Sequence, residues 1–153
     1  MPLKVGDKAP AFTLYSDEKK EVSLKDYAGR NLIVLFFPMA FTGVCTEELC
    51  TMRDSLADFN SMDADIVAIS VDSPFTLEKF KEAEGLNFPL LSDFNKEVSR
   101  QYGSLYETFV LGMNGVSKRS AFVVDGDGVI RYAEVLDNAG NQPNYDAIRA
   151  TLN

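Results

Sequence analysis

The sequence contains no histidine, and this absence excludes several kinds of active site. Hydrolases built on a Ser–His–Asp or Cys–His arrangement need an imidazole as their base, so neither arrangement is available here. Zinc and iron sites also commonly use imidazole ligands, and the two cysteines alone make a poor transition-metal site. We therefore expect no hydrolase of these types and no metal centre.

Positive charge and long hydrophobic runs are also scarce. The chain has 15 Lys and Arg against 23 Asp and Glu, which gives a net charge of −8. An acidic surface repels phosphate backbones and anionic lipids, so nucleic acid and membrane are poor partners. No segment reaches membrane-spanning length, and the opening residues MPLKVGDKAPAF lack the apolar stretch of a signal peptide. We therefore expect a cytoplasmic protein.

The 153 residues predict a single α/β domain, 1–153, without internal repeats or linkers. The segments predicted as strands are Ala11–Tyr15, Glu21–Leu24, Asn31–Phe37, Asp65–Val71, Phe88–Leu91, Ser120–Val124 and Val129–Val135, and those predicted as helices are Thr46–Phe59, Phe75–Ala83, Asn95–Tyr102 and Asn144–Leu152. The first two strands predict an N-terminal hairpin. Alternation of strands and helices, followed by a second hairpin and a helix, predicts a central mixed β-sheet flanked by helices.

The stretch FFPMAFTGVCTEELC, residues 36–50, contains the residues most suited to chemistry. A buried strand ends at Pro38, and Cys45 follows where a helix begins. Unpaired backbone N–H groups and the positive end of the helix dipole favour a thiolate there, and the thiolate is the nucleophilic form. Thr42 precedes Cys45 by three residues, so its hydroxyl can reach the sulfur or an approaching oxygen. A cysteine at such a position is otherwise simply a small buried apolar residue.

Pro38, Thr42 and Cys45 form the pattern P-x-x-x-T-x-x-C, which is the signature of the peroxiredoxin family. Further segments resemble that family in the same order along most of the chain: VGDKAPAFTL (5–14), DIVAISVDSP (65–74), FPLLSD (88–93) and RSAFVVDGDGVIRY (119–132). The resemblance implies a thioredoxin-like fold and a thiol peroxidase that reduces hydrogen peroxide, organic hydroperoxides or peroxynitrite. It implies no metal, flavin or haem.

The resemblance also assigns roles to individual residues. Cys45 corresponds to the cysteine that attacks the peroxide and becomes a sulfenic acid, and Pro38 to the proline that shields the pocket. Thr42 and Arg119 correspond to the groups that stabilise the charge moving to the departing oxygen, and Arg119 alone among the arginines matches the R-x-x-F position. Glu48 corresponds to a glutamate that orients this arginine in many relatives, although glutamate in a first helical turn is also ordinary capping chemistry.

Cys50 allows two mechanisms. On an intact helix, five residues give about 7.5 Å of rise, so a disulfide between Cys45 and Cys50 requires the first turn to unwind. The C-x4-C spacing resembles the bacterioferritin-comigratory or Q-type subgroup, in which the second cysteine resolves the sulfenic acid and thioredoxin or a similar dithiol protein reduces the disulfide. The segments LLSDF, AFTG and VIRYAE resemble the AhpE-type subgroup, in which an external thiol resolves the sulfenic acid. We favour resolution by Cys50.

Other interpretations remain open at this stage. The same fold can serve a redox sensor or chaperone for which peroxide turnover is incidental, or a binding domain with an inert Cys45. A thioredoxin-type oxidoreductase needs C-x-x-C, which the chain lacks, and a reducing cytoplasm disfavours a structural disulfide. The sequence is compatible with a monomer or a homodimer. We expect the loop residues Phe37, Met39, Ala40 and Phe41 to shape the peroxide pocket.

Overall fold

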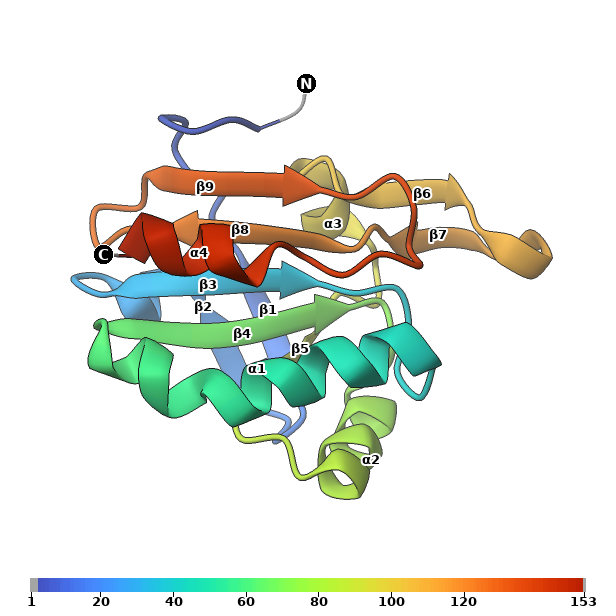
Figure 1. The fold of residues 1–153 in the computed structure, drawn as a ribbon. Coiled ribbons are helices and arrows are strands. Elements are labelled where there is room, and N and C mark those ends of the chain that lie inside the picture. Colours follow the sequence, from blue (N-terminus) through green and yellow to red (C-terminus); the bar gives the residue numbers. More distant parts are fainter. Residues whose placement is uncertain (1–2, 153) are drawn as a thin grey trace.

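A seven-stranded mixed sheet forms the centre of the computed structural model, which describes residues 3–152 (Figure 1). Residues 1, 2 and 153 of the expected domain lie outside the described residues. The strands of this sheet are β1 (Thr13–Ser16), β2 (Glu21–Ser23), β3 (Asn31–Phe36), β4 (Ala64–Ser70), β5 (Leu90–Ser92), β8 (Ser120–Val124) and β9 (Ile130–Val135). They lie in the order β2-β1-β5-β4-β3-β8-β9. The pairs β3–β4 and β4–β5 are parallel and the remaining pairs are antiparallel, as the prediction of a mixed sheet requires.

The central position of strand β3 in the sheet explains why its sequence is apolar without interruption. It lies between β4 and β8, so both of its faces are covered. Ile33 and Leu35 belong to the core on one side of the sheet, while Leu32, Val34 and Phe36 belong to the core on the other side. Because successive side chains of a strand point to opposite faces, a strand buried on both faces has no polar position to spare.

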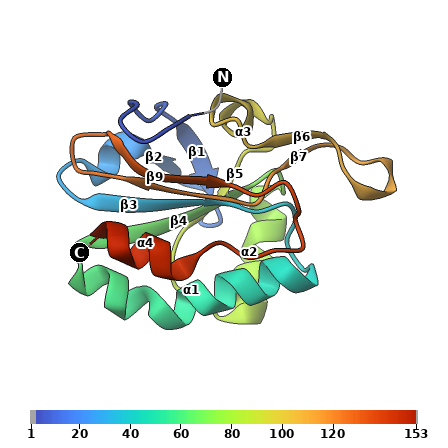
Figure 2. The ribbon, with the colours of Figure 1, turned by 45° about the horizontal axis from the view of Figure 1, so that its top comes forward.

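Helices cover both faces of the sheet, as the sequence predicted (Figure 2). On one side lie α1 (Gly43–Ser61), α2 (Pro74–Glu84) and α4 (Tyr145–Leu152), and on the other lie α3 (Glu97–Gln101) and the 3-10 turn η1 (Leu24–Tyr27). Leu49, Met52 and Phe59 of α1 are fully buried against the sheet because they recur at helical spacing. The predicted hairpins β1–β2 and β8–β9 and the final helix are confirmed with small changes at their ends.

Helix α1 begins three residues before the predicted start at Thr46. Thr42 has extended backbone angles (φ −101°, ψ 154°) and its carbonyl accepts the first helical hydrogen bond from the N–H of Thr46, at 2.9 Å. Gly43 therefore opens the helix, and Cys45 is its third residue. The segment TGVC consists of weak helix formers, so helix propensity does not predict this first turn.

A two-stranded arm was not predicted. It consists of β6 (Leu105–Thr108), the short 3-10 turn η2 (Val110–Gly112) and β7 (Asn114–Ser117), and it projects from the body of the molecule (Figure 1). The strands are four residues each and their burial does not alternate, so the periodicity that identifies a strand is absent. The arm matters because its residues form one side of the pocket described below.

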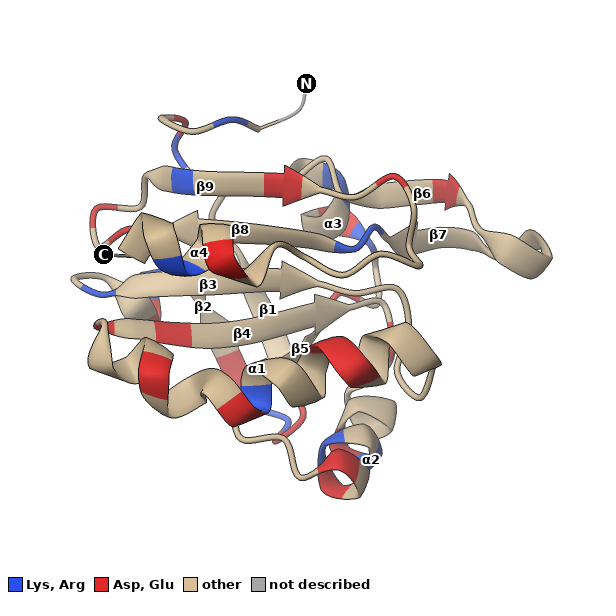
Figure 3. Ribbon diagram, viewed as in Figure 1, with Lys and Arg blue, Asp and Glu red and all other residues tan. Residues whose placement is uncertain are grey.

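Acidic residues are spread along α1 and α2 and also occur at several strand ends (Figure 3). Most ion pairs among residues 3–152 are exposed, such as Arg131 with Asp125 at 2.6 Å, and such pairs stabilise a fold little. The pair of Arg119 with Glu48 differs because both side chains are buried. Within residues 3–152 no helix combines the length and apolar character needed to cross a membrane.

Candidate active site

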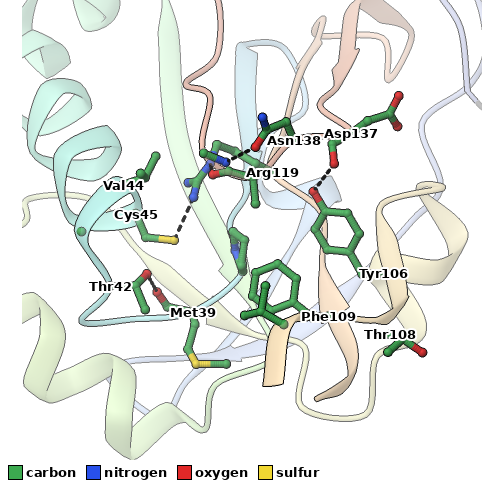
Figure 4. Close-up of a pocket in the computed structure, with 15 residues that line it drawn as sticks. Met39, Thr42, Val44, Cys45, Tyr106, Thr108, Phe109, Arg119, Asp137 and Asn138 are labelled. Atoms are coloured by element: carbon green, nitrogen blue, oxygen red, sulfur yellow. Dashed lines mark hydrogen bonds between the residues drawn. The ribbon is translucent and has the colours of Figure 1, made fainter. Parts of the chain in front are cut away.

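Cys45 lies in the first turn of α1, where the helix follows the loop at the end of β3. The backbone N–H groups of Gly43, Val44 and Cys45 have no partner within the helix, and they give the N-terminus its partial positive charge. The thiol is free, and the residue is 1% exposed. Its sulfur points toward Arg119 (Figure 4). This position places a thiol in electropositive surroundings.

Arg119 brings the site together through three hydrogen bonds. Its Nη2 donates to Cys45 Sγ at 3.2 Å, Nη1 donates to Glu48 Oε1 at 2.5 Å, and Nε donates to the carbonyl of Ala139 at 3.0 Å. The side chain comes from the residue just before β8, the neighbour of β3, so sheet pairing brings it to the end of β3. With the side chain 2% exposed, the guanidinium is held in one orientation against the sulfur.

Glu48 lies one turn after Cys45 on the same face of α1 and is fully buried. One carboxylate oxygen accepts from Arg119, whereas Oε2 has no hydrogen-bond partner among residues 3–152. Burial raises the pKa of Glu48 to about 7, because removal of the carboxylate from water outweighs the opposing effect of Arg119. The contact with Arg119 agrees with the orienting role expected for this residue.

Thr42 lines the same pocket, but its hydroxyl does not donate to the sulfur. Oγ1 donates to the carbonyl of Met39 at 2.7 Å, so its single proton is directed into the loop. The oxygen keeps lone pairs that can accept from the O–H of a hydroperoxide. Asp72 also holds this loop in place, because its Oδ2 accepts a hydrogen bond from the N–H of Ala40 at 2.8 Å.

These groups open into a pocket of about 660 Å³ (Figure 4). Pro38, which is buried, and Met39 form the side next to Cys45. The opposite side comes from the arm, where the rings of Tyr106 and Phe109 are stacked with centroids 5.2 Å apart. The six residues singled out from the sequence are Pro38, Thr42, Cys45, Glu48, Cys50 and Arg119, and the structure brings all but Cys50 into or directly beneath this pocket.

The expectation for the loop residues holds only for Met39. Phe37 and Ala40 are buried in the core beneath the loop and do not line the pocket. Phe41 has a left-handed backbone (φ 66°), is 55% exposed, and packs its ring against Phe80 at a centroid distance of 5.1 Å. The error has a simple cause: the sharp turn at Phe41 sends its side chain away from Cys45.

Cys50 lies on α1 but outside the pocket, and its thiol is free. It is half-buried, and its Sγ donates to Glu84 Oε2 of α2 at 3.6 Å. The helix is continuous from Gly43 to Ser61, so the two cysteines are separated by about 7.5 Å along its axis. That rise exceeds the usual span of about 4.4–6.8 Å between Cα atoms of a disulfide.

Comparison with known proteins agrees with this geometry. Residues 5–133 match the AhpC/TSA family. The chain belongs to this family, and it is a peroxiredoxin. It is 43% identical over 136 residues to alkyl hydroperoxide reductase E of Mycobacterium tuberculosis, covering 87% of this chain and 86% of that protein. It is 36% identical over 149 residues to peroxiredoxin Bcp of Escherichia coli, covering 96% of this chain and 94% of the relative.

Solved structures confirm the thioredoxin-like fold of this peroxiredoxin. The crystal structure of peroxidoxin BcpB from Mycobacterium tuberculosis superposes with a TM-score of 0.86 at 30% identity, covering 98% of this chain and 96% of that chain. A peroxiredoxin-like protein from Aquifex aeolicus gives a TM-score of 0.89 at 25% identity. Family membership makes the protein an oxidoreductase that reduces peroxides through a thiol, with similarity to both Bcp and AhpE relatives.

The sequence did not reveal the side of this peroxiredoxin's pocket that the arm provides. Tyr106, Phe109 and Val110 come from the unpredicted β6–β7 arm, and Ala139 from the connection after β9. Val110 is 61% exposed and its neighbour Leu111 is 94% exposed, which is unusual for residues of this kind. The only signal in the sequence was the apolar pair Val110 and Leu111 followed by Gly112, a pattern that suits an exposed turn with a binding role.

Proposed function

We propose that Cys45 is the nucleophile of this peroxiredoxin and that Arg119 and Thr42 assist it. The observation that carries this proposal is the contact of Arg119 Nη2 with Cys45 Sγ at 3.2 Å inside the pocket. A buried guanidinium fixed by Glu48 and Ala139 cannot turn toward solvent, so its charge acts on the sulfur and on whatever oxygen approaches it.

The chemistry is a displacement at one peroxide oxygen. The thiolate of Cys45 forms an S–O bond while the O–O bond breaks, which gives a sulfenic acid and an alkoxide or hydroxide that leaves as alcohol or water after taking a proton. Negative charge therefore moves from sulfur to the departing oxygen. Arg119 and the N–H groups of the first turn of α1 lie where this charge develops, so they stabilise the transition state more than the ground state. Thr42 accepts from the peroxide O–H and holds it in line, and Pro38 keeps water from this side.

The pocket supports organic hydroperoxides as substrates alongside hydrogen peroxide and peroxynitrite. Met39, Phe109 and Val110 give it apolar walls. A volume of about 660 Å³ is far larger than hydrogen peroxide needs and lies in the range of small-molecule binding sites. An apolar group attached to the peroxide therefore has a surface against which it can be buried.

The second half of the cycle is assigned to Cys50. Its thiol attacks the sulfenic acid of Cys45 and forms a disulfide within the chain, with release of water. This step needs the first turn of α1 to unwind, and local opening of a helix end costs less than global unfolding. Thioredoxin or a similar dithiol protein then reduces the disulfide. We further propose that the chain is one domain that acts in the cytoplasm, as a monomer or homodimer.

Intact mass after one equivalent of hydrogen peroxide tests this assignment in the wild type and in Cys50→Ser. We expect the wild type to lose two hydrogens as the disulfide forms, and the variant to gain one oxygen as a stable sulfenic acid. If both proteins gain one oxygen, Cys50 takes no part and an external thiol resolves Cys45. If neither mass changes, the assignment of Cys45 as nucleophile is wrong.

A further inference from the structure

Cys50 lies against a carboxylate that the first half of the reaction does not use. Its Sγ donates to Glu84 Oε2 at 3.6 Å, across the contact between α1 and the C-terminal end of α2. The thiol and the carboxylate are both half-buried, so water screens their interaction only in part. No other side chain among residues 3–152 makes a hydrogen bond to either of these two groups.

Helix stability does not explain a glutamate at position 84. Glu84 is the last residue of α2, followed by the left-handed cap at Gly85, and a carboxylate at this end is repelled by the helix dipole. The position is nevertheless held firmly. Arg53 donates from Nη1 to the carbonyl of Glu84, and Asn87 donates to the carbonyl of Arg53 at 3.3 Å. Arg53 lies one turn beyond Cys50. The same stretch of α1 therefore carries both the thiol and the guanidinium that holds the backbone of Glu84.

The pair survives the movement that the disulfide requires. Cys50 lies beyond the first turn of α1, so unwinding of the residues before Glu48 would already free Cys45 to approach it. Leu49 and Met52, on either side of Cys50, are fully buried against the sheet and hold this part of α1 in place. Glu84 therefore remains beside the Cys50 thiol when the sulfenic acid of Cys45 arrives.

We propose that Glu84 is the base that takes the proton from Cys50 as this thiol attacks the sulfenic acid of Cys45. This proposal rests on the proposed role of Cys50 as the resolving cysteine. The S–H bond of Cys50 and the S–O bond of Cys45 break, and the S–S bond forms. The departing hydroxide takes up the proton that Glu84 accepted from Cys50 and leaves as water, so that Glu84 is again a carboxylate and no outside oxidant or reductant is consumed.

The need for a base follows from the surroundings of Cys50. Burial raises the pKa of this thiol, the charge of Arg53 lowers it, and the hydrogen bond to Glu84 and its charge raise it further. The net shift is upward, so Cys50 is a thiol at neutral pH and reacts slowly as it stands, since the thiolate is the nucleophile. A carboxylate in hydrogen-bond contact removes the proton during the attack itself.

The test is the rate of disulfide formation after one equivalent of hydrogen peroxide, followed by quenching and mass spectrometry. Wild type is compared with Glu84→Gln, which keeps the shape and removes the base, and with Glu84→Asp, which keeps a carboxylate. Glu82→Gln is the matched control, because it removes one charge from the same helix and its carboxylate pairs with Lys79. Each rate is measured across neutral pH, and formation of the sulfenic acid is recorded separately.

We expect E84Q to form the disulfide about 100-fold more slowly than wild type near neutral pH, at the lower end of general base effects. Its rate should rise with pH because only the spontaneous thiolate reacts, whereas the wild-type rate should depend less on pH because a base removes the proton during the attack itself. The rate of E84D should lie between those of E84Q and wild type, and the rate of E82Q should equal that of wild type. A purely structural role for Glu84 would not change the pH profile.

Two results would overturn the proposal, and they can be told apart. If wild type forms the disulfide and E84Q does so at the same rate and with the same pH profile, Glu84 is not the base and Cys50 remains the resolving cysteine. If wild type stops at the sulfenic acid, the role of Cys50 fails and that of Glu84 fails with it.

Discussion

At the scale of single residues, Arg119 connects the groups on which the chemistry depends. One guanidinium contacts the sulfur of Cys45, the carboxylate of Glu48 and the carbonyl of Ala139. Burial lowers the pKa of Arg119, whereas the charges of Glu48 and Cys45 raise it. Together with the hydrogen bonds to these two residues, the raising effects outweigh the effect of burial, so the side chain stays charged. A single buried cation thus faces the sulfur of Cys45.

Arg119→Lys tests the need for this planar group. Lysine keeps the charge, but one ammonium cannot match three contacts made from separate nitrogens of a fixed fork. We expect the second-order rate constant for oxidation of Cys45 to fall by about 10²–10³, as for loss of one fixed donor to a developing anion. Arg131→Lys is the control, because Arg131 is an exposed partner of Asp125 at the start of β9, the end away from Arg119. An R119K rate constant equal to that of wild type would contradict the proposed role.

At the scale of elements, the first turn of α1 has two opposing tasks. In the proposed mechanism it must be formed for Cys45 to meet the peroxide, and it must unwind for Cys45 to meet Cys50. Gly43 is the first residue of the helix, and a Cβ placed there would meet no atom within 4 Å. Glycine weakens a helix relative to alanine by about 1 kcal/mol. Gly43 therefore favours unwinding at the point where the proposed mechanism requires it.

Gly43→Ala should stabilise this turn and slow the second step. An increase of about 1 kcal/mol in the cost of unwinding corresponds to disulfide formation about fivefold slower once the sulfenic acid has formed. Quenched mass spectrometry on fully oxidised protein measures this rate. Asn60→Ala improves helix propensity at the far end of α1 and serves as the control, which should match wild type. Equal rates for all three proteins would mean that unwinding of the first turn does not limit the step.

The elements also differ in how far the sequence predicted them. The unbroken apolar run of β3 and the caps Ser73 and Gly85 of α2 follow directly from local chemistry, and both elements are where they were expected. The arm formed by β6 and β7 has no such periodicity, since β6 is half-buried or exposed along its length and most of β7 is buried. The pocket was therefore predicted from the side of Cys45 and missed from the side of Tyr106 and Phe109, because their approach depends on tertiary contacts.

At the scale of the whole molecule, buried Glu48 links stability to pH. Its pKa is raised to about 7 in the folded protein, mainly by burial, against about 4.3 in an unfolded chain. The folded state therefore binds a proton that the unfolded state has released. The resulting stability is fully present below the unfolded value and is lost as pH rises through about 7.

Glu48→Gln should remove this dependence, since an amide does not titrate. Urea unfolding of both proteins between about pH 5 and 8 measures the effect. We expect the free energy of unfolding of wild type to fall relative to that of E48Q as pH rises, and the difference to level off above about pH 7 to 8. A constant difference across this range would show that Glu48 ionises in the folded protein as it does in the unfolded chain.

The central claim is that Cys45 reacts with the peroxide, and peroxide consumption by Cys45→Ser tests it most directly. Wild type, Cys45→Ser and Cys50→Ser are each given hydrogen peroxide or an organic hydroperoxide with excess dithiol reductant. We predict turnover by wild type and by Cys50→Ser, which the added thiol can resolve, and none by Cys45→Ser. Turnover by Cys45→Ser at the wild-type rate would contradict the account and place the nucleophile elsewhere.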